Sequence, residues 1–320
     1  MELARKLTVY SDGAAGNELP ALALAAALST EPASCVRLRA PWPQRLWLPH
    51  GPVLAAVRWQ PPLDPEAWPD IAIGAGRMGA AALLTVGRAS RGRTRTIQIL
   101  DPRINPAHYD LVIAPAHDRL NKPNVVVIEG SLHAIDNAWI SRERLAHAAL
   151  GRLASPRTVV LVGGHRRGVK LGPQDIERLA ETLQNWRNHD GGSLLLLGSR
   201  RTPNAWQKAL RRALPQAEVC WFGAADGDNP YRGALAWGDR FIVTADSVNM
   251  LSESLGTGRP VYSLCAGVPA GKLGDFHRAL VESGRLRPLR AQPAVWDYPP
   301  LRELERILPI VRERLSLGTG

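Results

Sequence analysis

The amino-acid sequence predicts an α/β protein of two doubly wound, Rossmann-like domains, each built on a parallel β-sheet. Short apolar runs bounded by Gly, Pro, Asn or Asp alternate with helical segments along the whole chain. Such runs are typical of strands buried on both faces of a parallel sheet. The alternation occurs in two series separated by a helical stretch at 141–155, and the length of 320 residues suits two domains of ordinary size.

The elements follow in order. In the first series we expect strands at 7–10, 70–74, 95–100, 111–114 and 125–128, with a helix at 19–28. In the second we expect strands at 157–162, 193–197, 218–222, 240–244 and 260–263, with helices near 173–187, 203–214, 231–237 and 248–256. A helical apolar stripe at 301–315 closes the chain. The expected domains are therefore 1–150 and 151–295, followed by a C-terminal helix in 296–320.

Composition narrows the classes of function. The net charge is +11, with 35 Arg and 5 Lys, which calls for a negatively charged partner unless a biased genomic composition explains the Arg excess. Because this charge is spread along the chain, we expect no nucleic-acid partner. Three isolated cysteines without a CxxC pair exclude a disulfide scaffold and a zinc finger. Without a long apolar run or a secretory signal, the expected location is cytoplasmic; the oligomeric state does not follow from the sequence.

The segment 243–253 is the most specific motif. A strand ends in Thr244, Asp246 and Ser247, which are strong capping residues for a helix beginning near Val248. The free amides at such a helix start favour an anion at the carboxyl edge of the sheet. Glu253 lies about two turns into this helix, where its carboxylate could accept hydrogen bonds from ribose hydroxyls. The alternative is a well-capped helix with a solvated Glu.

Two further loops of the second half suit a phosphate. Gly163 and Gly164 follow the first strand and allow close approach of the backbone, with cations nearby. Ser199 and Arg200 follow the next strand in the same way. In a parallel doubly wound sheet these loops and the 243–253 segment share one edge, so they can converge. Plain strand-to-helix turns with surface charges are the alternative.

The first half offers acid–base candidates. The loop after its first strand holds Asp12, Gly13, Asn17 and Glu18, which could bind a sugar or supply a general base. Alternatively, it is a plain loop in which Asn17 caps the next helix. The pair His117-Asp118 follows the strand at 111–114 and could reach the same place, although such a pair is more often just surface.

The sequence resembles the mitochondrial fission Elm-type family, named after a plant fission factor and including bacterial relatives. The matching pieces are Ser11–Gly13, Gly16–Glu18, Ile73–Arg77, Ile97–Arg103, Pro115–Asp118, Val162–Gly164, Ser199–Pro203, Asn229–Tyr231, Val243–Glu253 and Thr257–Tyr262. They run in order along nearly the whole chain. The first loop departs from the family pattern, which has a His beside the Asn-Glu pair and bulkier residues at positions 14 and 15.

The resemblance implies a GT-B glycosyltransferase-like fold with a nucleotide-sugar donor on the C-terminal domain and an acceptor on the N-terminal domain. It implies no cofactor and no bound metal, and a last helix that crosses back to the first domain. On this model the diphosphate lies over Asp246–Val248, aided by Gly163, Gly164, Ser199 and Arg200, and Glu253 holds the ribose. Asp12 or Glu18 would deprotonate the acceptor, with His117 as a further candidate and Gly13, Asn17 and Asp118 on the acceptor side.

Two other functions remain open. One is a non-catalytic, membrane-associated interaction protein on the same fold. The other is an NAD-dependent nucleotide-sugar epimerase or dehydrogenase, because Gly74–Gly79 fits GxGxxG and Asp101 ends the next strand. No Tyr in the sequence has a Lys four residues later, as such epimerases typically require.

A segment of the first half suggests a membrane surface. It interleaves cations with apolar side chains, notably Arg37, Arg39, Trp42, Arg45 and Trp47. Trp at the level of lipid headgroups with Arg beside it is the chemistry of a membrane-surface patch. We therefore expect docking on an anionic membrane, which would suit a lipid-linked acceptor. The alternative is that the Trp side chains pack on the N-terminal core.

Overall fold

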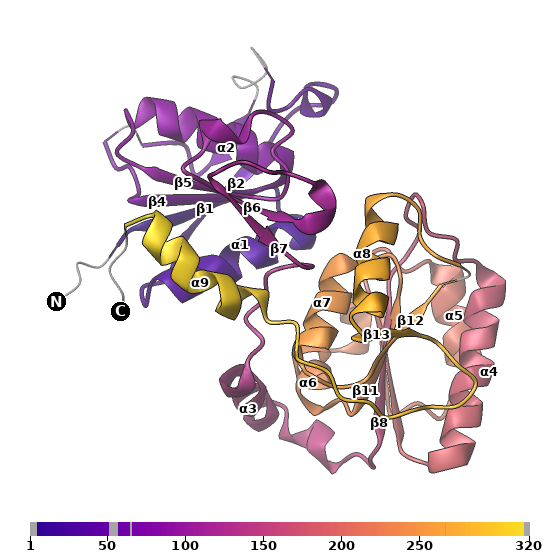
Figure 1. Ribbon diagram of the computed structural model, residues 1–320. Helices are drawn as coiled ribbons and strands as arrows, with labels where there is room; N and C mark the ends of the chain where they lie inside the picture. The colour runs from indigo at the N-terminus through magenta and orange to yellow at the C-terminus, as the bar shows by residue number, and fades with distance from the viewer. Residues whose placement is uncertain (1–4, 51–56, 65, 266, 317–320) are drawn as a thin grey trace. The chain divides into compact units, whose positions relative to one another are not determined.

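The computed structural model describes residues 5–50, 57–64, 66–265 and 267–316. The chain divides into two compact units (Figure 1): unit 1 comprises Met1–Ala134 and Arg302–Gly320, and unit 2 comprises Ile135–Leu301. The predicted α/β fold of two Rossmann-like domains is confirmed. The expected boundary after residue 150 lies within unit 2.

Unit 1 contains a seven-stranded sheet with the order β3-β2-β1-β4-β5-β6-β7. Its strands are β1 (Leu7–Ser11), β2 (Ser34–Arg39), β3 (Arg58–Gln60), β4 (Ile71–Ala75), β5 (Arg95–Ile99), β6 (Leu111–Pro115) and β7 (Val125–Ile128). All pairs are parallel except that of β2 with the edge strand β3. The sequence analysis missed β2 and β3, because only Val36 and Leu38 of β2 are buried and its other residues face outward or are partly covered.

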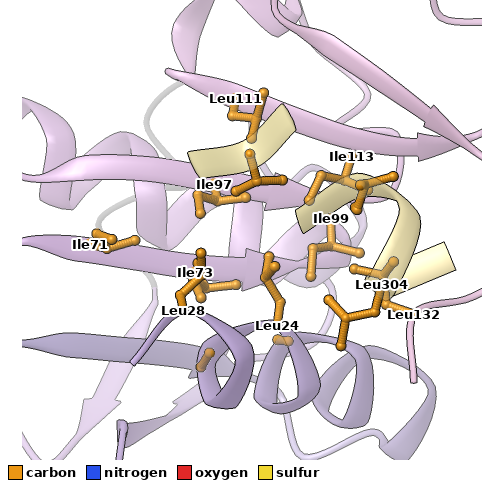
Figure 2. Close-up of a cluster of buried hydrophobic side chains, with 14 of the residues drawn as sticks. Leu24, Leu28, Ile71, Ile73, Ile97, Ile99, Leu111, Ile113, Leu132 and Leu304 are labelled. Atoms are coloured by element: carbon orange, nitrogen blue, oxygen red, sulfur yellow. The ribbon is translucent and has the colours of Figure 1, made fainter. Parts of the chain in front are cut away.

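Helices cover both faces of this sheet. Helix α1 (Ala15–Leu28) and helix α9 (Glu303–Arg314) pack on one face, and α2 (Gly76–Ala89) packs on the other. Figure 2 shows Leu24 and Leu28 of α1 and Leu304 of α9 against the isoleucines of β4, β5 and β6. The last helix thus completes the core of the unit that contains the beginning of the chain.

Gly74 and Gly79 of the GxGxxG segment have a packing role. A Cβ atom added to Gly74 would lie 2.9 Å from Cα of Gly79, and one added to Gly79 would lie 2.8 Å from the carbonyl carbon of Gly74. Glycine at both positions therefore allows α2 to approach β4 closely. This accounts for two glycines of the motif without a dinucleotide.

Unit 2 has a six-stranded, fully parallel sheet with the order β10-β9-β8-β11-β12-β13. Its strands are β8 (Arg157–Val162), β9 (Ser193–Gly198), β10 (Val219–Trp221), β11 (Arg240–Thr244), β12 (Val261–Leu264) and β13 (Leu286–Pro288). Its helices are α3 (Asn137–Ala146), α4 (Pro173–Asp190), α5 (Asn204–Ala213), α6 (Tyr231–Trp237), α7 (Val248–Gly256) and α8 (Lys272–Glu282). Helix α8 and strand β13 were not expected from the sequence.

The two faces of the unit 2 sheet are buried by different helices. Val159 and Leu161 of β8 face α3, α6, α7 and α8, while Val160 and Val162 face α4 and α5. Strands buried on both faces explain the continuous apolar runs. The helices after β8 and β11 therefore lie on opposite faces of the sheet, although the two strands are neighbours. The carboxyl ends of β8 and β11 are thus the topological switch point, where such folds bind ligands.

Candidate functional site

The carboxylate of Asp246 lies at the switch point of unit 2 and connects three loops. Asp246 follows β11 and is fully buried, with 0% of its surface exposed. Its Oδ1 accepts a hydrogen bond from the Thr244 hydroxyl at 2.6 Å, and its Oδ2 accepts from the Gly164 amide at 3.1 Å and from Nη2 of Arg201 at 2.6 Å. The loops after β8, β9 and β11 converge here, as the sequence analysis expected.

The glycines of the loop after β8, Gly163 and Gly164, allow the three loops to pack closely together. A Cβ atom on Gly163 would lie 2.1 Å from Oδ1 of Asp246, and one on Gly164 would lie 2.0 Å from the carbonyl oxygen of Arg201. The Gly163 amide donates to Oγ1 of Thr244 at 2.7 Å, as the Gly164 amide does to Asp246. Both amides already have acceptors within the protein, so these glycines let the loops pack and do not present free donors to a phosphate.

Two guanidinium groups supply positive charge at the same point. Arg201 pairs with Asp246, and Nη1 of Arg166 donates to the main-chain oxygen of Asp246 at 2.6 Å. Although Arg166 is exposed as a residue, the contact of its guanidinium group with Asp246 is partly buried, and this burial together with the neighbouring Arg201 lowers the pKa of Arg166. One carboxylate faces two guanidinium groups, and both arginines are exposed. The site thus has a net positive charge open to an anion.

The loop after β9 orients Arg201. Oγ1 of Thr202 donates to the Val162 carbonyl at 2.6 Å and accepts from the Ser199 amide at 2.8 Å. Oγ of Ser199 accepts from the Arg201 amide at 3.2 Å. Arg200, which the sequence analysis expected at the donor site, is exposed like its neighbour Arg201, but it is Arg201 that contacts Asp246. Adjacent arginines in a loop carry no periodic signal that would distinguish them.

His277 of α8 also supports the site. Its ring is buried, its Nε2 lies 2.9 Å from the carbonyl oxygen of Ala245, and burial lowers its pKa. A neutral ring that donates from Nε2 fits this contact and holds the turn that presents Asp246. The sequence analysis missed His277 because α8 itself was not expected.

Helix α7 begins as expected. The Ser247 side chain caps it by accepting a hydrogen bond from the Met250 amide at 3.3 Å, and Val248 is its first residue. Glu253 is half-buried and accepts a hydrogen bond from the Tyr231 hydroxyl of α6. Burial raises the pKa of Glu253 to about 7, although the Tyr231 hydrogen bond acts to lower it. Glu253 is therefore not the solvated helix residue of the alternative interpretation.

In unit 1, the loop after β1 holds its carboxylates in ion pairs. Glu18 accepts from the Ser11 hydroxyl at 2.6 Å and from both terminal nitrogens of Arg37. Asp12 accepts from the Ala14 amide at 3.0 Å and lies 3.5 Å from Nη2 of Arg45. The ion pair of Asp12 with Arg45 is therefore weaker than that of Glu18 with Arg37.

The expected helix at 19–28 begins earlier than predicted. Helix α1 starts at Ala15, so Asn17 lies inside it and donates to both Asp12 oxygens at 3.3 Å. The alternative in which Asn17 caps the helix is therefore wrong. Gly13 has a φ of +75°, and a Cβ atom there would lie 3.1 Å from Nη1 of Arg37, so this position suits glycine.

His117 and Asp118 lie in the 3₁₀ turn η4 (Ala116–Asp118) after β6. Oδ2 of Asp118 accepts from the Asp101 amide at 3.3 Å and so connects the loops after β5 and β6. Strands β4 and β5 lie between β1 and β6, which places these loops about 14 Å along the sheet from the loop after β1. The sheet therefore does not bring His117 beside Asp12.

Cationic and apolar side chains of residues 37–48 in unit 1 are partly exposed. Trp42 and Trp47 are 75% and 66% exposed, so the alternative in which these side chains pack on the core is wrong. Within the described ranges, no helix is long and apolar enough to cross a membrane. In that same part of the chain, no group of three or more His, Cys, Asp or Glu side chains could hold a metal ion.

Solved structures share this fold. The UDP-GlcNAc 2-epimerase of Methanocaldococcus jannaschii is 12% identical and matches with a TM-score of 0.57, covering 96% of this chain and 99% of the other. The same enzyme in complex with UDP-GlcNAc and UDP matches at 12% identity and a TM-score of 0.54, with the same coverage. The glycosyltransferase of kitacinnamycin is 16% identical at a TM-score of 0.51, covering 98% and 94%. These likenesses show the GT-B fold.

Sequence relatives identify the family. The mitochondrial fission protein ELM1 of Arabidopsis thaliana is 29% identical over 275 residues, covering 78% of this chain and 64% of its own length. An uncharacterized protein of Rickettsia prowazekii is 23% identical over 288 residues, covering 78% of this chain and 81% of its own. The family model described as mitochondrial fission ELM1 matches residues 15–315. This chain therefore belongs to the mitochondrial fission ELM1 family.

Proposed function

We propose that this protein binds a nucleotide sugar at the switch point of unit 2 and transfers the sugar, without a metal ion, to an acceptor bound by unit 1. The observation that carries the proposal is the pair Arg166 and Arg201 around the single carboxylate of Asp246. Arginine is well suited to phosphate because its planar group donates two parallel hydrogen bonds. The diphosphate would lie on these two side chains, with the start of α7 adding favourable dipole charge.

Other features of unit 2 support the same ligand. Glu253 lies on α7 beside Tyr231, and its carboxylate would accept hydrogen bonds from the ribose hydroxyls. Ser199 and Thr202 hold the loop that presents Arg201. Solved structures of the same fold include an enzyme named for UDP-GlcNAc. We therefore propose UDP-GlcNAc as the first donor to test.

In unit 1, Asp12 is the general base that we propose for the acceptor hydroxyl. Its contact with Arg45 is at 3.5 Å, whereas Glu18 is bound by Arg37 and Ser11. Gly13 and Asn17 shape the same loop. An acceptor with a lipid anchor would match the exposed Trp side chains of this unit, and we propose a cytoplasmic protein that associates peripherally with the membrane.

Calorimetric titration with UDP-GlcNAc, UDP and NAD tests the donor site. Arg166→Gln should weaken UDP-GlcNAc binding roughly tenfold to a hundredfold, the usual effect of losing a hydrogen bond to a charged group. Arg212→Gln is the matched control, because Arg212 is an exposed arginine on α5 of the same unit. Unchanged affinity in Arg166→Gln would contradict the proposed diphosphate site, and binding of NAD alone would favour the dehydrogenase or epimerase alternative.

Turnover separates an enzyme from a non-catalytic protein. Asp12→Asn should slow transfer or hydrolysis of the bound sugar by about 10²–10⁴, the usual contribution of a general base, while leaving donor affinity unchanged. Release of UDP reports transfer or hydrolysis, whereas inversion at C2 of the sugar would report the epimerase alternative, and NMR follows both. A wild-type protein that binds the donor without any turnover would favour a non-catalytic interaction protein, a function consistent with the ion pairs that hold both Asp12 and Glu18.

A further inference from the structure

We propose that residues 40–48, which follow β2, together with the edge of the sheet formed by β2 and β3, dock on an anionic membrane surface. We call this surface the Trp42/Trp47 patch and define it by Arg39, Trp42, Leu46, Trp47 and Arg58. The proposal does not depend on nucleotide-sugar transfer, because it rests on exposure and charge in unit 1 alone.

The apolar part of the patch is exposed over a short stretch of chain. Trp42 is 75%, Leu46 52% and Trp47 66% exposed. Of the large apolar side chains exposed in the described part of the chain, Trp42 and Trp47 are the only aromatic ones. By contrast, Trp186 and Trp206 of unit 2 are 0% and 3% exposed. Exposing two tryptophans only five positions apart in sequence is costly in water and indicates a partner.

The surrounding structure holds these side chains outward. The 3₁₀ turn η1 (Gln44–Leu46) is closed by hydrogen bonds from the Leu46 amide to the Pro43 carbonyl at 2.9 Å and from the Trp47 amide to the Gln44 carbonyl at 3.0 Å. The next residue, Leu48, is 1% exposed and packs in the core. The hydrogen bonds of η1 and the burial of Leu48 therefore hold this turn in place while the side chains of Trp42 and Trp47 stay exposed.

The charged part of the patch lies at the edge of the sheet. In the antiparallel pair of β2 with β3, Arg39 lies directly opposite Arg58. Like charges at directly opposite positions destabilise a sheet. Both side chains are exposed, and among the residues that the structure describes neither has a carboxylate within ion-pair distance. Two unneutralised guanidinium groups at an edge strand favour a negatively charged partner.

The combination selects a membrane over other anionic partners. Tryptophan and arginine together suit the interface of a bilayer, where the ring lies at the headgroup level and the guanidinium contacts lipid phosphate. A single-stranded nucleic acid would also stack on the tryptophans, but it would gain little from the aliphatic Leu46 between them. An anionic bilayer satisfies the aromatic, the aliphatic and the cationic groups at once.

Co-sedimentation of the full chain with vesicles tests the proposal. Binding to vesicles of phosphatidylglycerol mixed with phosphatidylcholine should exceed binding to pure phosphatidylcholine and should fall with added salt. Arg39→Gln/Arg58→Gln should weaken partitioning about 30-fold, because each basic residue near an anionic surface raises it about fivefold. Trp42→Ser/Trp47→Ser should abolish the part of the binding that resists salt.

Matched controls come from unit 2. Leu145→Ser/Val295→Ser removes two apolar side chains that are 82% and 91% exposed, and Lys208→Gln/Arg212→Gln removes two exposed positive charges. Neither control should change vesicle binding. Because all of the substituted side chains are exposed, the variants should fold, and circular dichroism checks this.

Three results would overturn the proposal. One is equal sedimentation with anionic and neutral vesicles at low salt. A second is a patch variant that binds anionic vesicles as well as the controls do. The third is an assignment of the patch to another partner: a dimer that dissociates in Trp42→Ser/Trp47→Ser by sedimentation equilibrium, or binding of a single-stranded oligonucleotide that this variant loses while vesicle binding stays unchanged.

Discussion

Asp246 is a buried carboxylate that accepts hydrogen bonds from three other residues. Thr244, Gly164 and Arg201 each donate to it. Because donors from the end of β11 and from the loops after β8 and β9 share one acceptor, a small change in any of them alters the position of the others. Single substitutions here therefore test the geometry of the site directly.

Gly163→Ala should lower the melting temperature, because its new Cβ atom would lie 2.1 Å from a buried oxygen of Asp246. Overpacking of this kind costs about 1–3 kcal/mol. Gly16→Ala is the control: nothing lies within 4 Å of the added Cβ atom, and the position is the second residue of α1, so this change should not lower the melting temperature. Equal melting temperatures for the two variants would contradict the packing of the three loops.

Glu253 makes stability depend on pH in a defined direction. Its pKa is raised from 4.5 to about 7 by burial in the folded protein. Between these values the folded state holds a proton that the unfolded state has released, so stability falls as pH rises from about 5 to 7 and changes little above that. Glu253→Gln should remove this dependence and be more stable than the wild type at pH 8. Denaturant unfolding at pH 5 and pH 8 measures it, and parallel pH profiles of the two proteins would contradict the raised pKa.

At the scale of elements, α9 belongs to the unit with which the chain begins. Ile307 is fully buried against the unit 1 core, whereas Ile310 on the same helix is only half-buried. The Arg306 guanidinium donates to the Val127 carbonyl of β7 at 2.8 Å, and Glu303 accepts from the Glu129 amide at 2.8 Å. The helix is therefore attached to unit 1 by both apolar and polar contacts.

Ile307→Ala should destabilise unit 1 by about 2–5 kcal/mol, the range for truncating a buried Ile to Ala. Ile310→Ala should cost less because its side chain is already partly in water. Hydrogen exchange resolves the effect by element: protection should fall in α1 and β7, and protection of β8 and β9 should stay. A loss confined to unit 2 would contradict the assignment of α9.

At the scale of the whole molecule, the two units differ in chain continuity. Unit 2 is a single segment, Ile135–Leu301, with its own sheet and its own two clusters of buried side chains. Unit 1 is assembled from two segments far apart in sequence. Continuity should therefore determine which unit folds when produced alone.

A fragment of residues 135–301 should fold and unfold cooperatively and should retain binding of UDP-GlcNAc. A fragment of residues 1–134 should not, because the face of its sheet covered by Leu304, Ile307 and Val311 would be open to water. Adding residues 302–320 through a flexible linker should restore cooperative unfolding. Thermal melting by circular dichroism measures cooperative unfolding of all three fragments, and an unfolded 135–301 fragment would contradict the independence of unit 2.

The sequence alone determined the fold class and predicted that three loops of the second half meet at one edge of the sheet. Both follow from interactions between residues close in sequence. Strands buried on two faces appear as continuous apolar runs, and Ser247 caps α7 by accepting a hydrogen bond from the Met250 amide, three residues later. Because carboxyl ends of parallel strands share one edge, the convergence of the loops after β8, β9 and β11 was also predictable.

Only the tertiary structure decided which residues of those loops contact one another. That Arg201 and not Arg200 contacts Asp246, and that Gly163 and Gly164 serve packing, depends on atoms brought together from positions 37 to 83 residues apart. Strand β2 and the edge strand β3 were missed because partial exposure weakens an apolar pattern. Whether Trp42 and Trp47 are buried or exposed depends on whether side chains from distant parts of the chain cover them, and the neighbouring sequence does not indicate this.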